Sequence, residues 1–195
     1  MSLALKNKYF LLRHGQNNHQ AERPNFTYLY PDNDPPCFLT NQGIEEAKKA
    51  GEVLKGKGIG LIYSSDILRA RETARIVAEI IGKKEIIYDT RLRDINWGVF
   101  AGKDKEQAWG FFNNNALEKF ETPPPQGESW NQCLERMVGI LREIENNFQN
   151  KTILIVSHGD PLWLLEGYVK ELSKEELVRQ RQEQGVLGTG EIREL

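Results

Sequence analysis

The sequence Tyr9-Phe10-Leu11-Leu12-Arg13-His14-Gly15 is the strongest indication of the fold. Its first four residues form an apolar run with the length of a strand buried on both faces. The run ends directly in an arginine, a histidine and a glycine. Since ligands of open α/β sheets bind beyond the carboxyl ends of the strands, this order predicts a strand that leads into a functional site.

Other parts of the chain repeat this alternation. Apolar or β-branched runs predict strands at 59–63, 85–88 and 152–156, and a last short strand is expected at 191–193. Helical periodicity covers 41–57, 66–81 and 127–148. Strands that alternate with helices predict an α/β fold, a three-layer αβα sandwich with a mostly parallel central sheet.

Composition and charge indicate which binding partners and which cellular location to expect. The 195 residues are 39% hydrophobic, with a formal net charge of −2, so no basic excess points to nucleic acid or to a membrane surface. The start MSLALKNKYF lacks the apolar run of a signal peptide, and no stretch is long enough to span a bilayer. A cytoplasmic protein is expected. Cys37 and Cys133 are expected to be reduced thiols, and no zinc pattern is present.

Chemically active side chains follow several of the predicted strands. If the strands are parallel, these residues meet at one edge of the sheet. The set comprises Arg13 and His14 after the first run, Arg69 after the second, Asp94 shortly after the third, and His158 after the fourth.

This set suits phosphoryl transfer. Arg13 and Arg69 can grip a phosphate dianion through paired N–H groups, and the helix that begins near Asp66 adds partial positive charge. Neighbouring arginines lower the pKa of a histidine, so His14 stays neutral and able to attack phosphorus. His158 can hydrogen-bond the charge that spreads over the phosphoryl oxygens.

Two glycines and a carboxylic acid complete the predicted site. Gly15 and Gly159 remove side chains beside both histidines and allow backbone N–H groups to approach the substrate. The leaving alkoxide needs a proton from a nearby carboxylic acid with a raised pKa.

Motifs along most of the chain resemble those of the histidine phosphatase superfamily, with its phosphoglycerate-mutase-like fold. The five segments that carry the resemblance, in order, are Leu11-Leu12-Arg13-His14-Gly15, Leu39-Thr40-Asn41-Gln42-Gly43, Tyr63-Ser64-Ser65-Asp66-Ile67-Leu68-Arg69-Ala70, Gly127-Glu128-Ser129 and Val156-Ser157-His158-Gly159. The resemblance implies a single histidine-phosphatase-like domain over 1–195, with substrate-loop insertions near 17–39 and 94–126.

The resemblance also implies a role for each matching residue. His14 would be the phosphorylated nucleophile, and Arg13, Arg69 and His158 would bind the phosphoryl group. Gly15, Gln20 and Gly159 would complete substrate binding, with no metal and no cofactor. Asp94 occupies the position of the proton donor, where family members usually have Glu, and is favoured over Asp160, which follows the second histidine by two positions.

Three functions follow from this set. The first is a phosphatase that hydrolyses a small phosphate monoester through a phosphohistidine on His14. The second is a phosphotransferase of the cofactor-dependent phosphoglycerate mutase type, and the third is a non-catalytic binder of phosphorylated ligands. The chain lacks the Gly-Arg pair common in the family after the first motif, which favours the phosphatase. Neither the physiological substrate nor the oligomeric state follows from the sequence.

Overall fold

The computed structural model describes residues 5–29 and 36–195 and contains a mostly parallel five-stranded sheet. The strand order is β3-β2-β4-β1-β5. β1, β2, β3 and β4 pair in parallel, whereas β5 runs antiparallel to β1. The strands span Lys8–Arg13 (β1), Ile59–Ser64 (β2), Ile87–Tyr88 (β3), Thr152–Ser157 (β4) and Ile192–Glu194 (β5).

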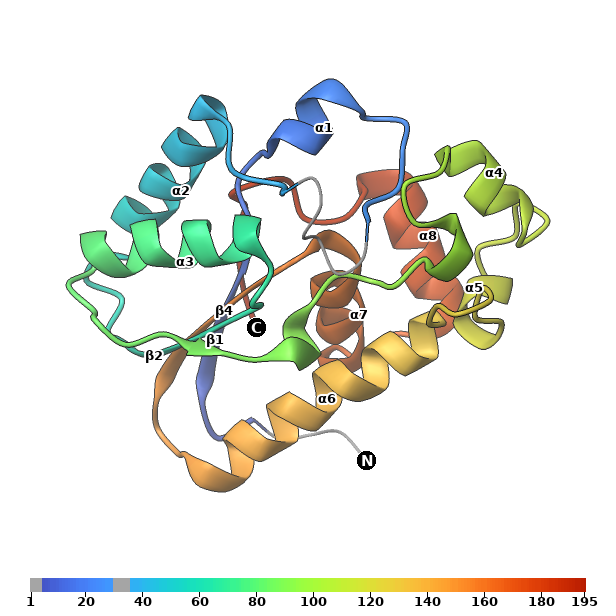
Figure 1. Cartoon of the computed structure of the whole chain (residues 1–195). Helices are drawn as coiled ribbons and strands as arrows, with labels where there is room; N and C mark the ends of the chain where they lie inside the picture. Colours follow the sequence, from blue (N-terminus) through green and yellow to red (C-terminus); the bar gives the residue numbers. More distant parts are fainter. Residues whose placement is uncertain (1–4, 30–35) are drawn as a thin grey trace.

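Helices cover both faces of the sheet and confirm the three-layer α/β fold (Figure 1). One layer holds α2 (Asn41–Leu54) and α3 (Leu68–Ile80), and the other holds α6 (Trp130–Asn147) and α7 (Gly159–Val169). The remaining helices are α1 (Asn18–Glu22), α4 (Lys105–Gly110), α5 (Glu118–Glu121) and α8 (Lys174–Gln184), with 3-10 turns η1 (Thr90–Leu92) and η2 (Gly98–Phe100).

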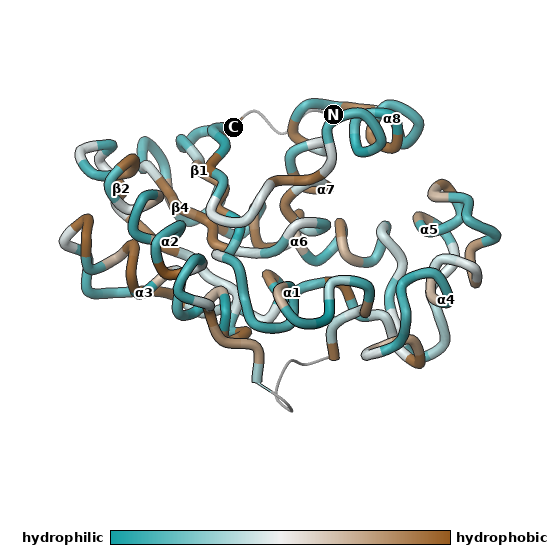
Figure 2. Tube along the Cα trace, turned by 90° about the horizontal axis from the view of Figure 1, so that it is seen from above, coloured by the Kyte–Doolittle hydropathy of each residue, from teal (hydrophilic) through white to brown (hydrophobic). Residues whose placement is uncertain are grey.

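The side chains of β1 point alternately to the two faces of the sheet, and each face has its own half of the hydrophobic core. Tyr9 and Leu11 pack toward α6 and α7, whereas Phe10 and Leu12 pack toward α2 and α3. Successive side chains of a strand point to opposite faces, so a strand buried on both faces must be apolar throughout. In Figure 2, the hydrophobic colour runs along β4 in the interior, while α1 on the outside is hydrophilic.

The boundaries differ from the sequence-based expectation at several ends. The predicted helices 41–57 and 66–81 are shorter, and the strand expected at 85–88 is reduced to Ile87–Tyr88. The predicted substrate-loop insertions near 17–39 and 94–126 contain the short helices α1, α4 and α5, and residues 30–35 lie outside the described part. Among the described residues, no helix combines the length and apolar character needed to cross a bilayer.

Candidate active site

The strand register brings the two central histidines together. β1 and β4 pair in parallel with Arg13 opposite Ser157, so the next residues along both strands are His14 and His158. The backbone N–H of His14 donates to the carbonyl of Ser157 at 3.0 Å, which extends the ladder past the strand ends. The two imidazole rings lie 5.2 Å apart between centroids, and both side chains are buried.

The hydrogen bonds of His14 define which ring nitrogen is basic. Its Nδ1 lies 2.8 Å from the carbonyl oxygen of Gly15, which can only accept, so we assign the proton to Nδ1. Nε2 then carries the lone pair and accepts from Nε of Arg69 at 3.2 Å. Burial, reinforced by the charges of Arg69 and Arg13, holds the pKa of His14 well below 6.5. The imidazole is therefore neutral, with its unprotonated nitrogen directed at the Arg69 guanidinium.

His158 is oriented by Ser65, which follows β2. The Ser65 hydroxyl oxygen lies 2.9 Å from Nε2 of His158 and also accepts from the backbone N–H of Ile67, so its proton can go to Nε2. We therefore assign the ring proton of His158 to Nδ1, which has no hydrogen-bond partner among the described residues. Burial holds the pKa of His158 well below 6.5. A neutral ring with an unused Nδ1–H can donate to an incoming oxygen.

Arg69 connects His14 to a carboxyl group. Its side chain is fully buried, and its Nη2 donates to Oδ2 of Asp94 at 2.8 Å. The same Asp94 oxygen lies 3.7 Å from Nδ1 of His158. The ring of Tyr28 packs against the guanidinium of Arg69, 4.0 Å from its central carbon. The structure therefore brings the two histidines, Arg69 and Asp94 into one cluster.

The two candidate acids have opposite electrostatic settings. Burial raises the pKa of Asp94 above 3.8 and outweighs the lowering by Arg69. Burial also tends to raise the pKa of Asp160. The positive charges of Arg181 and Lys119 lower it by more, so the pKa of Asp160 lies well below its ordinary value. Asp160 is thus held ionised, whereas the pKa of Asp94 is shifted in the direction that favours its protonated form.

Hydrogen bonds to the main chain fix the segment that carries Asp94. The Ser157 hydroxyl donates to the carbonyl of Leu92 at 2.7 Å. The Arg136 guanidinium, from α6, donates to the carbonyl of Asp94 at 3.1 Å and is paired with Glu128. Glu128 therefore holds Arg136 in place. This structural role accounts for a carboxylate just before α6, and no catalytic role is needed.

Arg13 ends β1 and is held by the segment before β5. Its Nη1 donates to the carbonyl of Leu187 at 2.6 Å, while its Nε has no partner among the described residues. A Cβ on Gly159 would lie 3.3 Å from the guanidinium carbon of Arg13 and 2.9 Å from Val186. Gly159 thus leaves room for the Arg13 side chain.

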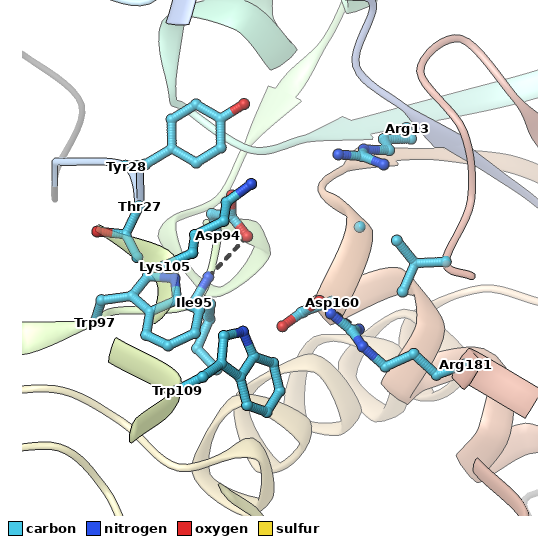
Figure 3. A pocket seen from close by; sticks show the side chains of 12 residues that line it. Arg13, Thr27, Tyr28, Asp94, Ile95, Trp97, Lys105, Trp109, Asp160 and Arg181 are labelled. Atoms are coloured by element: carbon cyan, nitrogen blue, oxygen red, sulfur yellow. Dashed lines mark hydrogen bonds and ion pairs between the residues drawn. The ribbon is translucent and has the colours of Figure 1, made fainter. Parts of the chain in front are cut away.

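A cavity of about 270 Å³ opens beside this cluster (Figure 3). It contains charged side chains of both signs and two indole rings. Its lining residues are Arg13, Thr27, Tyr28, Asp94, Ile95, Trp97, Lys105, Trp109, Gly159, Asp160, Arg181 and Val186. Of the residues predicted from sequence, Arg13, Asp94 and Gly159 line it directly.

Gly15 and Gln20 lie outside the cavity lining and stay predictions as substrate contacts. The N–H of Gly15 donates to the Thr73 hydroxyl at 3.0 Å, and a Cβ there would lie 2.3 Å from the carbonyl oxygen of Gly43. The side-chain oxygen of Gln20 accepts from the backbone N–H of Asn17 in the capping box of α1. In this structure both residues shape the loop that follows β1.

Sequence analysis did not identify Tyr28, Lys105 or Arg181 as site residues. Tyr28 and Lys105 lie in segments with no regular periodicity, and Arg181 lies on α8, whose mostly polar sequence gives no amphipathic signal. Trp97 and Trp109 also line the cavity.

Comparison with known proteins places these features in a family. The sequence pattern of the histidine phosphatase superfamily (branch 1) matches residues 9–190. A 2,3-bisphosphoglycerate-dependent phosphoglycerate mutase of Parvibaculum lavamentivorans is 33% identical over 184 residues, covering 89% of this chain and 85% of that protein.

Solved structures give the same result for the fold. A mycobacterial glucosyl-3-phosphoglycerate phosphatase matches with a TM-score of 0.76 and 25% identity, covering 96% of this chain and 89% of that one. The α-ribazole phosphatase of Shigella flexneri matches with a TM-score of 0.77 and 20% identity, covering 96% of this chain and 89% of that one.

Proposed function

Since this chain belongs to the histidine phosphatase superfamily, we propose that it is a phosphatase that hydrolyses a small phosphate monoester through a phosphohistidine on His14. The observation that carries the proposal is the pair of contacts made by the His14 ring. Its Nδ1–H is held by the Gly15 carbonyl, which leaves the Nε2 lone pair beside the guanidinium of Arg69, where a phosphoryl group would be bound.

In the first step, Nε2 of His14 attacks phosphorus and the bond from phosphorus to the ester oxygen breaks. Arg69 exchanges its contact with Nε2 for the phosphoryl oxygens, with Arg13 and the Nδ1–H of His158 as further donors. Asp94 gives its proton to the leaving oxygen, for which its raised pKa is suited. The Gly15 carbonyl stabilises the positive charge that the imidazole gains.

In the second step, Asp94 is a carboxylate and acts as the base. It takes a proton from water, water oxygen attacks phosphorus, and the bond from phosphorus to Nε2 breaks. Inorganic phosphate leaves, and the products restore a neutral His14 and a protonated Asp94. The low pKa of Asp160 makes it unsuited to this exchange of protons, which supports Asp94 as the donor.

The cavity supports a small ester as substrate. A volume of about 270 Å³ lies just below the range of about 300–1,000 Å³ that is usual for small-molecule sites. Thr27 and Tyr28 of the segment 17–39 line it, as do Trp97 and Lys105 of the segment 94–126. We propose that these two insertions of the domain select the substrate.

The test is transfer of 32P from a labelled phosphate monoester to the protein, followed by acid-labile phosphate analysis. Wild type should be labelled and should release phosphate, while His14→Ala should do neither. The matched control is His19→Ala, which removes the chain's remaining histidine outside the pair and should keep the label. Phosphate release by His14→Ala at the wild-type rate would reject the proposal.

The mutase is a second candidate because the Parvibaculum relative, at 33% identity, carries that name. A mutase returns the phosphoryl group of His14 to a second hydroxyl instead of to water. Isomerisation of 3-phosphoglycerate, measured with and without the bisphosphate primer, separates the two functions. Primer-dependent isomerisation faster than phosphate release would favour the mutase.

A further inference from the structure

The cavity contains cations that the proposed phosphoryl transfer does not use. Arg181 and Lys105 line it together with Arg13. In Figure 3, Arg13 and Arg181 reach in from one side, and Lys105 lies on the opposite side with Trp97. Positive side chains therefore face one another across a space that the leaving part of a substrate would occupy.

Arg181 is held in one orientation. Its Nη1 donates to Oδ1 of Asp160 at 2.7 Å, and its guanidinium carbon lies 5.3 Å from the ring centroid of Trp130 and 5.0 Å from that of Trp163. The side chain nevertheless keeps 25% of its surface exposed. A guanidinium that is already positioned loses little conformational entropy when it binds an anion through its remaining N–H groups.

Asp160 also contacts a second cation, Lys119. Its Oδ2 accepts from Nε1 of Trp130 at 3.0 Å and lies 3.4 Å from Nζ of Lys119. The Lys119 side chain is only 1% exposed, and its ammonium lies 3.7 Å from the ring centroid of Trp97. Burial lowers the pKa of Lys119 to about 8, so the ammonium form still predominates at pH 7.

One carboxylate thus lies between two cations, which leaves a positive charge in excess beside the cavity. An ion pair that only fastened α8 to α7 would need no second cation behind Asp160. A poorly hydrated excess charge is costly unless an anion compensates it. Lys105, across the cavity, adds to the same field.

We propose that Arg181 is a specificity-determining residue, which binds an anionic group on the leaving part of the substrate. That group is a carboxylate or a second phosphate, because the planar fork of a guanidinium fits either one in a bidentate arrangement. The limited volume keeps the linker between the anion and the reacting phosphate short. This inference rests on the proposed phosphatase function and adds the class of substrate.

The experiment compares kcat/KM for three phosphate esters with short linkers: 3-phosphoglycerate, sn-glycerol 3-phosphate and propane-1,3-diyl bisphosphate. 3-Phosphoglycerate has a carboxylate where sn-glycerol 3-phosphate has a neutral hydroxymethyl group, and the third ester carries a second phosphate. Arg181→Met should lower kcat/KM at least about tenfold for the anionic ester that wild type prefers, as expected for the loss of a charge-assisted contact. The change for sn-glycerol 3-phosphate should stay within about twofold.

Arg181→Lys should keep part of the kcat/KM that Arg181→Met loses, because lysine has the positive charge but not the planar guanidinium that binds an anion in a bidentate arrangement. The control is Arg179→Met, which removes an exposed arginine from the same helix and should leave all three values unchanged. Whichever anionic ester loses more in Arg181→Met identifies the group that is bound.

Equal losses on all three esters in Arg181→Met would overturn the inference and leave the phosphatase in place. Absence of phosphate release by wild type from every ester, together with absence of 32P on His14, would reject the proposed function and this inference with it. Thermal unfolding of Arg181→Met and Arg181→Lys separates a loss of stability from a loss of recognition.

Discussion

Arg69 donates its Nε–H to Nε2 of His14 over 3.2 Å. The same guanidinium is paired with Asp94 at 2.8 Å, so one buried cation touches the group proposed to attack and the group proposed to protonate. Binding of a phosphoryl group between these residues would release both contacts at once. Arg69 therefore keeps the proposed nucleophile neutral and oriented, and a bound anion would replace His14 as the partner of Arg69.

Replacement of Arg69 should lower the rate of phosphate release. Arg69→Gln removes a buried donor to the phosphoryl oxygens, so we expect kcat to fall about 10²–10³-fold. Steady-state phosphate release measures the loss. Arg75→Gln, at an exposed position of the same helix α3, is the control and should keep wild-type activity. Similar losses in both variants would mean that Arg69 acts only through the helix.

The assignment of the acid predicts a dependence on the leaving group. Asp94→Asn should slow hydrolysis of alkyl phosphates by about 10²–10⁴-fold, since their alkoxides need a proton. p-Nitrophenyl phosphate has a stable leaving anion and should be affected much less.

Asp160→Asn provides the matched comparison for this test. Asp160 is held ionised by Arg181 and Lys119, so its replacement should lower activity on both kinds of ester by a similar factor. A selective loss on alkyl phosphates in Asp160→Asn, with none in Asp94→Asn, would transfer the role of proton donor to Asp160.

The pKa of His14 gives a prediction that does not require turnover. Burial, with Arg69 and Arg13, holds the pKa well below 6.5, and a group with a lowered folded-state pKa gains its proton only as the pH falls further. 15N NMR of histidine-labelled protein should show a neutral His14 with its proton on Nδ1 at pH 6.5. Arg69→Gln should raise this pKa. Titration of wild-type His14 near 6.5, or a proton on Nε2, would contradict the assignment.

Two glycine substitutions test how the loop after β1 is supported. A Cβ on Gly43 would lie 1.9 Å from the carbonyl oxygen of Gln16, so Gly43→Ala must displace this loop and should destabilise the fold by about 2 kcal/mol or more. Gly139 lies within α6 with no atom close to a new Cβ, and Gly139→Ala should stabilise by about 0.5–1 kcal/mol. Urea unfolding compares the two, and equal stability in both variants would refute the close-packing explanation.

Sequence patterns predicted the layers and the central cluster because these depend on local signals. Four strand-like runs ended at chemically distinctive residues, and the parallel arrangement alone brings His14 next to His158. The position of α7 could not be read from periodicity, because Gly159–Val169 is buried on nearly all sides and shows no polar face.

The cavity wall was beyond sequence reasoning for a different reason. Arg181 is held at the cavity by its hydrogen bond with Asp160, and Tyr28 is held there by packing on Arg69. No pattern in the sequence around either residue indicates these contacts. Contacts of this kind depend on tertiary packing between segments far apart in the chain. The choice between Asp94 and Asp160 also depended on partners such as Lys119, which lies 41 residues from Asp160.

The pairing of β1 with β4 has a consequence for how the protein acquires activity. Lys8 lies opposite Thr152, so β1 can pair with β4 only after the whole segment between these residues has left the ribosome. Closing so long a stretch of chain makes this late event slow relative to local helix formation. Nascent chains that end before β4 would therefore contain His14 but lack His158 and the assembled cluster, so we expect activity only once synthesis has passed His158.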